Sequence, residues 1–325
     1  MFLQKSWEMP NTMEPSHQSV LVEEVLTALA VKASDVVVDA TLGGAGHFAR
    51  LLSSLGTDGV LIGIDADHDA VERARGVVAN DHRTDRPIVH LINDNFRNLG
   101  QILDRLGVGK IDKALFDLGW SGFQLETARG FSFQNDEPLL MTYGEGGQTA
   151  AEIVNTSTEN ELADILYAYG EERFARGIAH AIVAARSEHR IISTKDLVDA
   201  IMRGTPAWYQ HRKIHPATKT FQALRIATND ELEALREALS QATDRLAPGG
   251  KLAVISFHSI EDRIVKSSFR DATHAGLGLG SKKPMTPSAS ELAANRRARS
   301  AKLRVFERSM VTRRLETGAA IPLYA

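Results

Sequence analysis

The amino-acid sequence predicts an α/β protein whose doubly wound, mostly parallel sheet is interrupted by a helical insert. Three observations support this prediction. Short apolar runs alternate with segments of helical periodicity in the first part of the chain and again near its end. These runs are continuously apolar, which is typical of strands that helices cover on both faces. After about residue 122 the alternation stops, and helical periodicity continues without an intervening strand.

The first part of the chain contains four expected strands. They are 36–38, 60–64, 88–92 and 111–116, with helices at 19–30, from the glycine turn to about residue 55, at 68–79 and at 97–106. Residues 127–150 are expected to form a loop, and helical periodicity covers 158–186 and 195–204. The α/β pattern resumes with a helix at 229–245, a strand at 252–257, a helix at 260–270, a loop at 274–290 and a strand at 302–307. We therefore expect one domain formed by residues 1–126 and 217–325, with residues 127–216 as the insert.

The composition excludes several kinds of site. The 325 residues include no cysteine, which excludes disulfides, thiolate zinc sites, iron–sulfur clusters and cysteine nucleophiles, including those that methylate carbon-5 of pyrimidines. The net charge of −3 excludes a globally basic nucleic-acid binder, although it allows a local basic patch. Neither a signal peptide nor a run of about 20 apolar residues is present, so we expect a soluble cytoplasmic protein.

Polar side chains follow four of the predicted strands. Asp39, Asp65, Asn93 and Asp117 each lie where a strand is expected to end. Because the carboxyl ends of parallel strands meet at one edge of a sheet, these residues are expected to line a common binding site there.

A glycine-rich turn and an acidic residue indicate an adenosine-containing cofactor. Residues 43–46 read Gly-Gly-Ala-Gly, and they allow the backbone and the following helix N-terminus to approach a ligand closely. Asp65 ends the next strand, where a carboxylate can accept hydrogen bonds from both ribose hydroxyls. A nicotinamide dinucleotide and S-adenosylmethionine are the two alternatives.

Three features favour S-adenosylmethionine. The glycine spacing differs from the G-x-G-x-x-G pattern of dinucleotide sites. Asp39 would repel a pyrophosphate, whereas it suits the ammonium of a methionine group. The segment Asp117-Leu118-Gly119-Trp120 resembles the Asp-Pro-Pro-aromatic motif of enzymes that methylate exocyclic amines. In such a motif a carboxylate and a carbonyl accept the N–H bonds of the amine while a ring stacks on the base, so Asp117 is the candidate catalytic residue.

Eight ordered motifs carry a family resemblance. They lie at 17–25, 39–47, 63–67, 129–133, 170–175, 215–226, 255–263 and 297–304. Over about residues 16–308 the chain resembles the bacterial 16S ribosomal RNA cytosine-N(4) methyltransferases. The resemblance implies a Rossmann-like class I methyltransferase with an inserted helical domain for substrate recognition. It also implies methylation of the N4 amine of a decoding-centre cytidine (nucleotide 1402) in 16S rRNA of the small ribosomal subunit.

The resemblance also implies individual site residues. The family's S-adenosylmethionine contacts fall on Ala45, Gly46, His47, Asp65, Phe96, Asp117 and Gln124, and no metal is implied. The chain departs from the family pattern at 120–123, and at 139–144, where it reads Leu-Leu-Met-Thr-Tyr-Gly instead of Leu-Asp-Met-Arg-Met-Asp. These departures leave two alternatives open, a shifted base or RNA specificity and a non-catalytic ribosome-assembly factor. An NAD-type oxidoreductase is a weaker one.

Basic residues concentrate near the C-terminus. Residues 295–314 contain eight arginines and lysines and a single acid, Glu307, while the rest of the chain is net negative. Such asymmetry favours phosphate binding, and the expected RNA-binding residues are Arg296, Arg297, Arg299, Lys302 and Arg304. A second basic cluster, 211–215, follows Trp208 and Tyr209, and together these residues can stack unpaired bases. The sequence does not indicate an oligomeric state.

Overall fold

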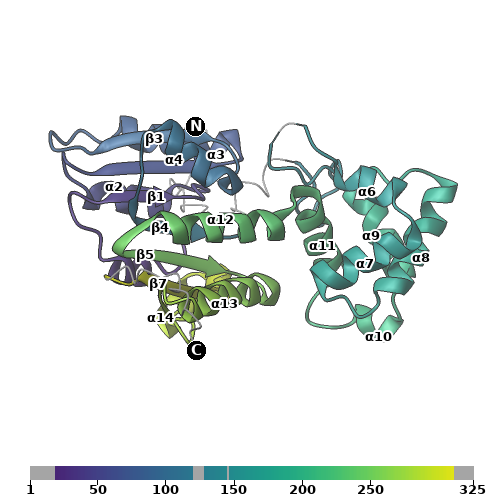
Figure 1. The fold of residues 1–325 in the computed structure, drawn as a ribbon. Helices are drawn as coiled ribbons and strands as arrows, with labels where there is room; N and C mark the ends of the chain where they lie inside the picture. Colours follow the sequence, from purple (N-terminus) through teal and green to yellow (C-terminus); the bar gives the residue numbers. More distant parts are fainter. Residues whose placement is uncertain (1–18, 120–127, 145, 311–325) are drawn as a thin grey trace, which may run out of the picture.

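The protein is built around one twisted, mostly parallel sheet (Figure 1). The computed structural model describes residues 19–119, 128–144 and 146–310. Its seven strands have the order β3-β2-β1-β4-β5-β7-β6. Their bounds are β1 (Val36–Asp39), β2 (Val60–Asp65), β3 (Ile88–Asn93), β4 (Ile111–Asp117), β5 (Leu246–Ser256), β6 (Gly278–Gly280) and β7 (Lys302–Arg308). β1 to β5 are parallel, and β7 and β6 add an antiparallel edge, which confirms the predicted fold class.

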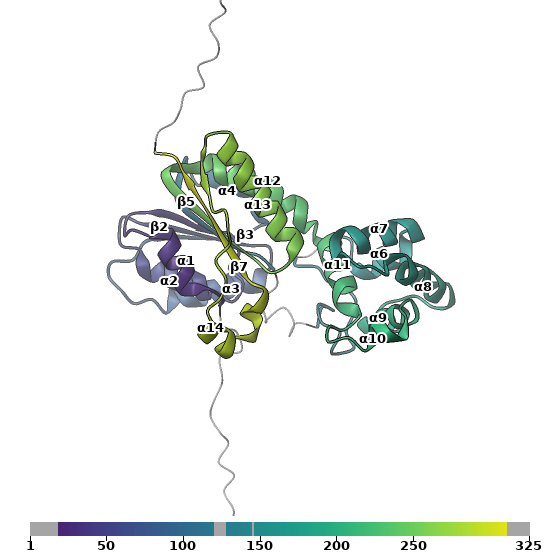
Figure 2. The same cartoon turned by 90° about the horizontal axis from the view of Figure 1, so that it is seen from below.

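Helices cover both faces of the sheet (Figure 2). α1 (Val22–Leu29), α2 (Gly46–Ser54) and α3 (His68–Ala79) pack on one face, and α4 (Leu99–Arg105), α12 (Glu231–Arg245) and α13 (Ser259–His274) pack on the other. Successive strand residues therefore belong to different cores: Val37 lies in the first apolar cluster and Val38 in the second. Burial on both faces explains why the strands are continuously apolar.

Among the described residues, six helices between β4 and α12 belong to the insert, which projects to one side of the sheet in both views (Figures 1 and 2). They are α6 (Ala150–Thr156), α7 (Glu159–Gly170), α8 (Ala175–Glu188), α9 (Thr194–Arg203), α10 (Ala207–Gln210) and α11 (Ala217–Asn229). They enclose an apolar cluster of their own, which includes Phe221 and Leu224 of α11. The core of the insert thus extends past residue 216.

Three elements differ from the expected pattern. The expected helical region 158–186 is divided, because α7 ends at Gly170 and its C-cap, Glu171, has a left-handed φ of 48°. β5 begins earlier than expected and includes Pro248-Gly249-Gly250, where the pairing with β4 shifts in register. The expected loop 274–290 contains β6, and a Cβ atom on Gly278 would lie 2.1 Å from the carbonyl oxygen of Glu307.

The 3-10 helix Phe96–Asn98 precedes α4, and α14 (Ala289–Ala294) and the 3-10 helix Arg296–Ser300 precede β7. In the part of the chain that the structure describes, no helix combines the length and the apolar character needed to cross a bilayer.

Candidate active site

A pocket lies at the carboxyl edge of the sheet. The last residues of β2 and β4, Asp65 and Asp117, contribute to its wall, together with the segment from Ala40 through the glycine turn and the N-terminus of α2. Asp39 and Asn93, the other two strand-end residues, do not line it. Among the predicted cofactor residues, Gly46, His47, Asp65, Phe96 and Asp117 line this pocket. The sheet topology has therefore brought together residues that are far apart in the sequence.

The glycine turn has a tightly specified backbone. Gly43 and Ala45 both have left-handed φ values, 48° and 61°, and α2 begins directly afterwards at Gly46. A Cβ atom on Gly46 would lie 2.1 Å from Oγ of Ser19, so any larger residue there would have to displace the Ser19 side chain. Ala45, another predicted cofactor residue, is buried at 2% exposure and does not line the pocket. The first turn of α2 presents unpaired N–H groups toward the pocket.

Asp65 ties the end of β2 to the glycine turn. Its Oδ2 accepts a hydrogen bond from the Gly43 N–H at 2.9 Å, and its Oδ1 accepts one from the Asp67 N–H at 2.8 Å. Burial outweighs these hydrogen bonds and raises the pKa of Asp65 to about 6. Each oxygen retains a lone pair, so the carboxylate can also accept hydrogen bonds from a diol.

Asp39, His47 and Asp117 form a buried polar cluster. The Nε2 atom of His47 lies 3.0 Å from the carbonyl oxygen of Val20 and must carry the proton, because a carbonyl only accepts. Its Nδ1 atom lies 3.3 Å from Oδ2 of Asp117. Burial lowers the pKa of His47, but the hydrogen bond to Asp117 and the charges of Asp117 and Asp39 outweigh it, so the net shift is upward.

Two carboxylate oxygens in this cluster have no hydrogen-bond partner among the described residues. They are Oδ2 of Asp39 and Oδ1 of Asp117. Asp39 is fully buried, and this burial raises its pKa to about 7. Asp117 is held in place because its N–H donates to Oγ1 of Thr41 at 2.7 Å. The cluster therefore offers two acceptors without donors, an arrangement that suits a ligand with an ammonium group and an amine.

A second group of polar residues reaches the pocket from the side of the insert. The hydroxyl of Tyr143 donates to Oε1 of Glu231 at 2.8 Å, and Glu231 also pairs with the buried Arg225 at 2.9 Å. The N–H of Tyr143 donates to Oδ1 of Asn229 at 3.0 Å. Burial raises the pKa of Tyr143, so this side chain stays a neutral hydrogen-bond donor. Tyr143, Asn229 and Glu231 all line the pocket.

The comparison with known protein families identifies the chain. A family model described as "MraW methylase family" matches residues 14–309. The chain belongs to this family. The match covers most of the chain and confirms the family resemblance that the eight sequence motifs predict.

Curated relatives match most of the length of this MraW methylase family protein. It is 47% identical over 295 residues to "Ribosomal RNA small subunit methyltransferase H" of Deinococcus radiodurans, and the match covers 90% of each chain. It is 45% identical over 315 residues to the protein of the same name from Heliobacterium mobile, covering 91% of this chain and all of that one. These relatives are methyltransferases by name, so they give no support to the oxidoreductase alternative.

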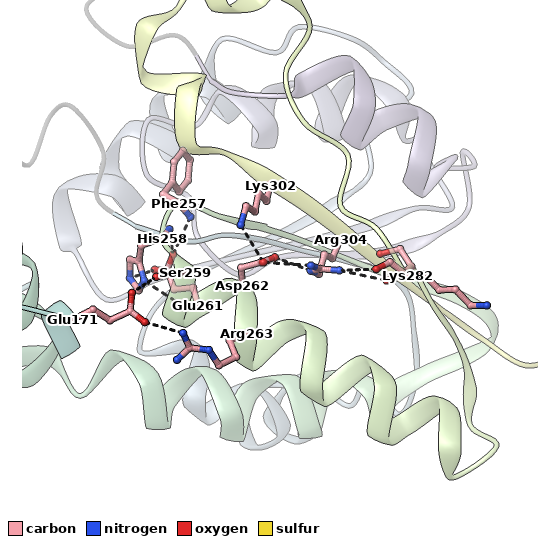
Figure 3. A network of polar contacts seen from close by, with 11 residues as sticks. Glu171, Phe257, His258, Ser259, Glu261, Asp262, Arg263, Lys282, Lys302 and Arg304 are labelled. Carbon is pink, nitrogen blue, oxygen red and sulfur yellow. Dashed lines mark hydrogen bonds and ion pairs between the residues drawn. The ribbon is translucent and has the colours of Figure 1, made fainter. Parts of the chain in front are cut away.

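The predicted RNA-binding residues of this methylase have different environments. Arg297 lines the pocket, and Arg299 is exposed. Lys302 is partly exposed and lies 3.2 Å from Oδ2 of Asp262. Arg304 is only 4% exposed, and its Nε donates to Oδ1 of Asp262 at 2.7 Å (Figure 3). The guanidinium joins β7 to α13 inside the protein, and its contact with RNA stays a prediction.

The polar network of Figure 3 also links the N-terminus of α13 to the insert. Glu261 of α13 lines the pocket, and its Oε2 accepts hydrogen bonds from the N–H groups of Phe257 and His258. On the outer side, Glu171 at the end of α7 accepts hydrogen bonds from Ser259 and Arg263, both at 2.7 Å.

Sequence reasoning missed part of the pocket wall. Asn229 and Glu231 come from the turn between α11 and α12, which no strand-end rule indicates. Tyr143 lies in a segment that already stood out because it departs from the family pattern. Trp120 and Gln124 lie outside the described residues, as does the side chain of Arg296.

Proposed function

We propose that this protein transfers a methyl group from S-adenosylmethionine to the N4 amine of cytidine 1402 in 16S rRNA of the small ribosomal subunit. One observation carries the proposal: in a chain of the MraW methylase family, the pocket that holds the glycine turn and Asp65 also holds the partnerless Oδ1 of Asp117. The curated relatives are small-subunit rRNA methyltransferases by name, which supports the same substrate. We propose the cytoplasm as the compartment, where small subunits assemble.

The residues of the pocket fit S-adenosylmethionine. Asp65 in the pocket wall suits the ribose hydroxyls. Asp39 is buried directly before the lining residue Ala40, and its partnerless Oδ2 suits the ammonium of the methionine group. Gly46 and His47 supply the helix N-terminus for the carboxylate. Phe96, whose ring meets that of Phe116 edge-on at 5.7 Å, offers an apolar surface for the adenine. When bound, the cofactor supplies an electrophilic methyl group.

The contribution of the protein is to orient the amine and to exclude water. The lone pair of the cytosine N4 amine is delocalised into the ring, so it attacks a methyl group poorly. Oδ1 of Asp117 can accept one N–H bond of this amine, which favours a geometry with the lone pair directed at the methyl group. His47 holds the carboxylate of Asp117, and Thr41 holds its backbone N–H. Alignment of this kind supplies much of the rate of a direct transfer.

Mass spectrometry of the product tests this proposal. Small subunits from a strain lacking this activity are incubated with the protein and labelled S-adenosylmethionine, and 16S rRNA is digested to nucleosides and fragments. We expect N4-methylcytidine at position 1402 with the wild-type protein and a large loss of label with Asp117→Asn. A different methylated nucleotide would indicate shifted specificity. Tight binding of subunits without methylation would indicate a non-catalytic assembly factor.

A further inference from the structure

An exposed tryptophan with an arginine beside it marks one end of the insert. Trp208 on α10 is 55% exposed, which is unusual for so large an apolar side chain. The guanidinium carbon of Arg173 lies 5.1 Å from the centre of the Trp208 ring and 5.0 Å from that of Phe174. Arg173 precedes α8, so the sequence separates it widely from Trp208 and the fold brings the two together.

Two further cations, Arg212 and Lys213, follow α10 in the sequence. The guanidinium of Arg212 lies 5.3 Å from the Tyr209 ring, and Arg212 and Lys213 are exposed. Within residues 19–119, 128–144 and 146–310, neither they nor Arg173 forms an ion pair. The closest acids in sequence face elsewhere. Glu172 is buried and accepts a hydrogen bond from the Tyr209 hydroxyl at 2.8 Å, and Glu171 binds Ser259 and Arg263.

We propose that an exposed surface of the insert binds unpaired nucleotides of the RNA substrate. This Trp208 surface consists of Arg173, Trp208, Arg212 and Lys213. This inference rests on the proposed function, because it assigns the insert a contact with the same RNA. Every base presents a face that can stack on Trp208, and every nucleotide carries a phosphate for the cations. A single-stranded RNA segment can therefore contact both the Trp208 ring and the cations. An acidic peptide would use the cations but would leave the large ring exposed.

The chain connects the Trp208 surface to the active site through two ring stacks. His215 follows the loop that carries Arg212 and Lys213, and its ring stacks on Phe133 with centroids 4.7 Å apart. Phe131, two residues before Phe133, stacks on the pocket residue Tyr143 at 5.5 Å. In Figure 1 α10 lies at the lower edge of the insert, away from β4. The nucleotides bound there are therefore distinct from the methylated cytidine.

Binding of RNA by surface variants tests the proposal. The probe is a fluorescent single-stranded RNA of the 16S sequence around the target cytidine, titrated with the full-length protein. Trp208→Ala should weaken binding by about fivefold to about a hundredfold, the usual effect of removing one base–aromatic stack. Trp208→Phe should restore most of this affinity. The matched control is Tyr167→Ala, since Tyr167 is a 70% exposed aromatic side chain on α7, and it should leave binding unchanged.

A second variant tests the cations. Arg212→Gln combined with Lys213→Gln should flatten the dependence of log affinity on log salt by about 1.4, since each phosphate contact of a single strand contributes about 0.7. In methylation assays both surface variants should raise KM for the small subunit with little change in kcat.

The readouts separate the failure of this inference from that of the proposed function. Wild-type methylation of the target cytidine with RNA binding unchanged in both variants would overturn the inference alone. Lost association with small-subunit proteins stripped of RNA, with RNA binding unchanged, would overturn it in favour of a protein partner. Absent wild-type methylation, with weakened RNA binding in the variants, would overturn the proposed function and leave the Trp208 surface an RNA-binding surface.

Discussion

Asp65 illustrates how a single side chain can hold a cofactor site together. It accepts one backbone hydrogen bond from the glycine turn and one from the residue that caps α3, while remaining available to a ribose. Asp65→Ala should weaken S-adenosylmethionine binding by about 1–3 kcal/mol, because the ribose hydroxyls would lose their hydrogen-bond acceptor. Isothermal titration calorimetry measures this loss. An affinity equal to that of the wild type would contradict the ribose role.

His47 is expected to act on the reaction through Asp117. Its two ring nitrogens reach two acceptors at once, the Val20 carbonyl and the Asp117 carboxylate. A glutamine amide can reach only one of them, so His47→Gln should leave Asp117 free to rotate. We expect kcat to fall by roughly ten- to a hundredfold, the scale of a small misplacement of reacting groups. Single-turnover methylation at saturating cofactor measures this step, and an unchanged rate would exclude a positioning role.

At the residue scale the sequence predicts the strand-end residues of the pocket better than its other walls. Asp65 and Asp117 could be placed because parallel strands end at one edge, whatever the details of packing. Glu231 could not, since its position depends on how α11 turns into α12 through the left-handed Asp230. The environment of Arg304 could not be predicted for a related reason. A run of arginines shows charge, but only the packing of β7 against α13 shows which guanidinium faces Asp262.

At the scale of elements, the pair of Arg304 and Asp262 fastens the antiparallel edge of the sheet. Both side chains are largely buried, at 5% and 14% exposure. Arg304→Met should therefore lower the free energy of unfolding by about 3 kcal/mol, because Asp262 keeps its charge with only the partly exposed Lys302 beside it. Urea unfolding measures the change. Arg299→Ala is the matched control: Arg299 is exposed, so this change should leave stability unaltered.

Some helix boundaries of the insert can be predicted from local sequence signals, and others cannot. α6, α7 and α9 each begin with a complete capping box, at Thr149, Thr158 and Ser193, and such patterns are readable in the sequence. The break between α7 and α8 is not readable in this way. It occurs at Glu171, a residue with no special preference for left-handed φ, and contacts with Ser259 and Arg263 of α13 accompany it. Tertiary contacts therefore help to set a boundary that periodicity alone misses.

At the scale of the whole molecule, the cluster of Asp39, Asp65 and His47 at the active site consists of groups whose pKa is raised on folding. Burial raises the pKa of Asp39 to about 7 and that of Asp65 to about 6, and the pKa of His47 is also raised. A group with a raised pKa binds more protons in the folded state, so its contribution favours folding below the unfolded pKa and is lost as pH rises through the folded pKa. The free energy of unfolding of the cofactor-free protein should therefore fall as the pH rises from about 4 to about 8, because these three groups lose their protons over that range.

Asp39→Asn tests this consequence. The variant cannot ionise, so at pH 8 it should be more stable than the wild type, whereas at pH 4 the two should be similar. The raised pKa of Asp39 corresponds to an advantage on the order of 2–4 kcal/mol, reduced in part because His47 loses a favourable charge. Urea unfolding of cofactor-free protein at both pH values measures it, with the exposed Asp58→Asn as control. If the free energy of unfolding had the same pH dependence in the wild type and in Asp39→Asn, ionisation of Asp39 would not destabilise the fold. If the profiles differ as expected, the same variant should bind S-adenosylmethionine more weakly, because the oxygen that destabilises the empty fold is the one that suits the cofactor's ammonium.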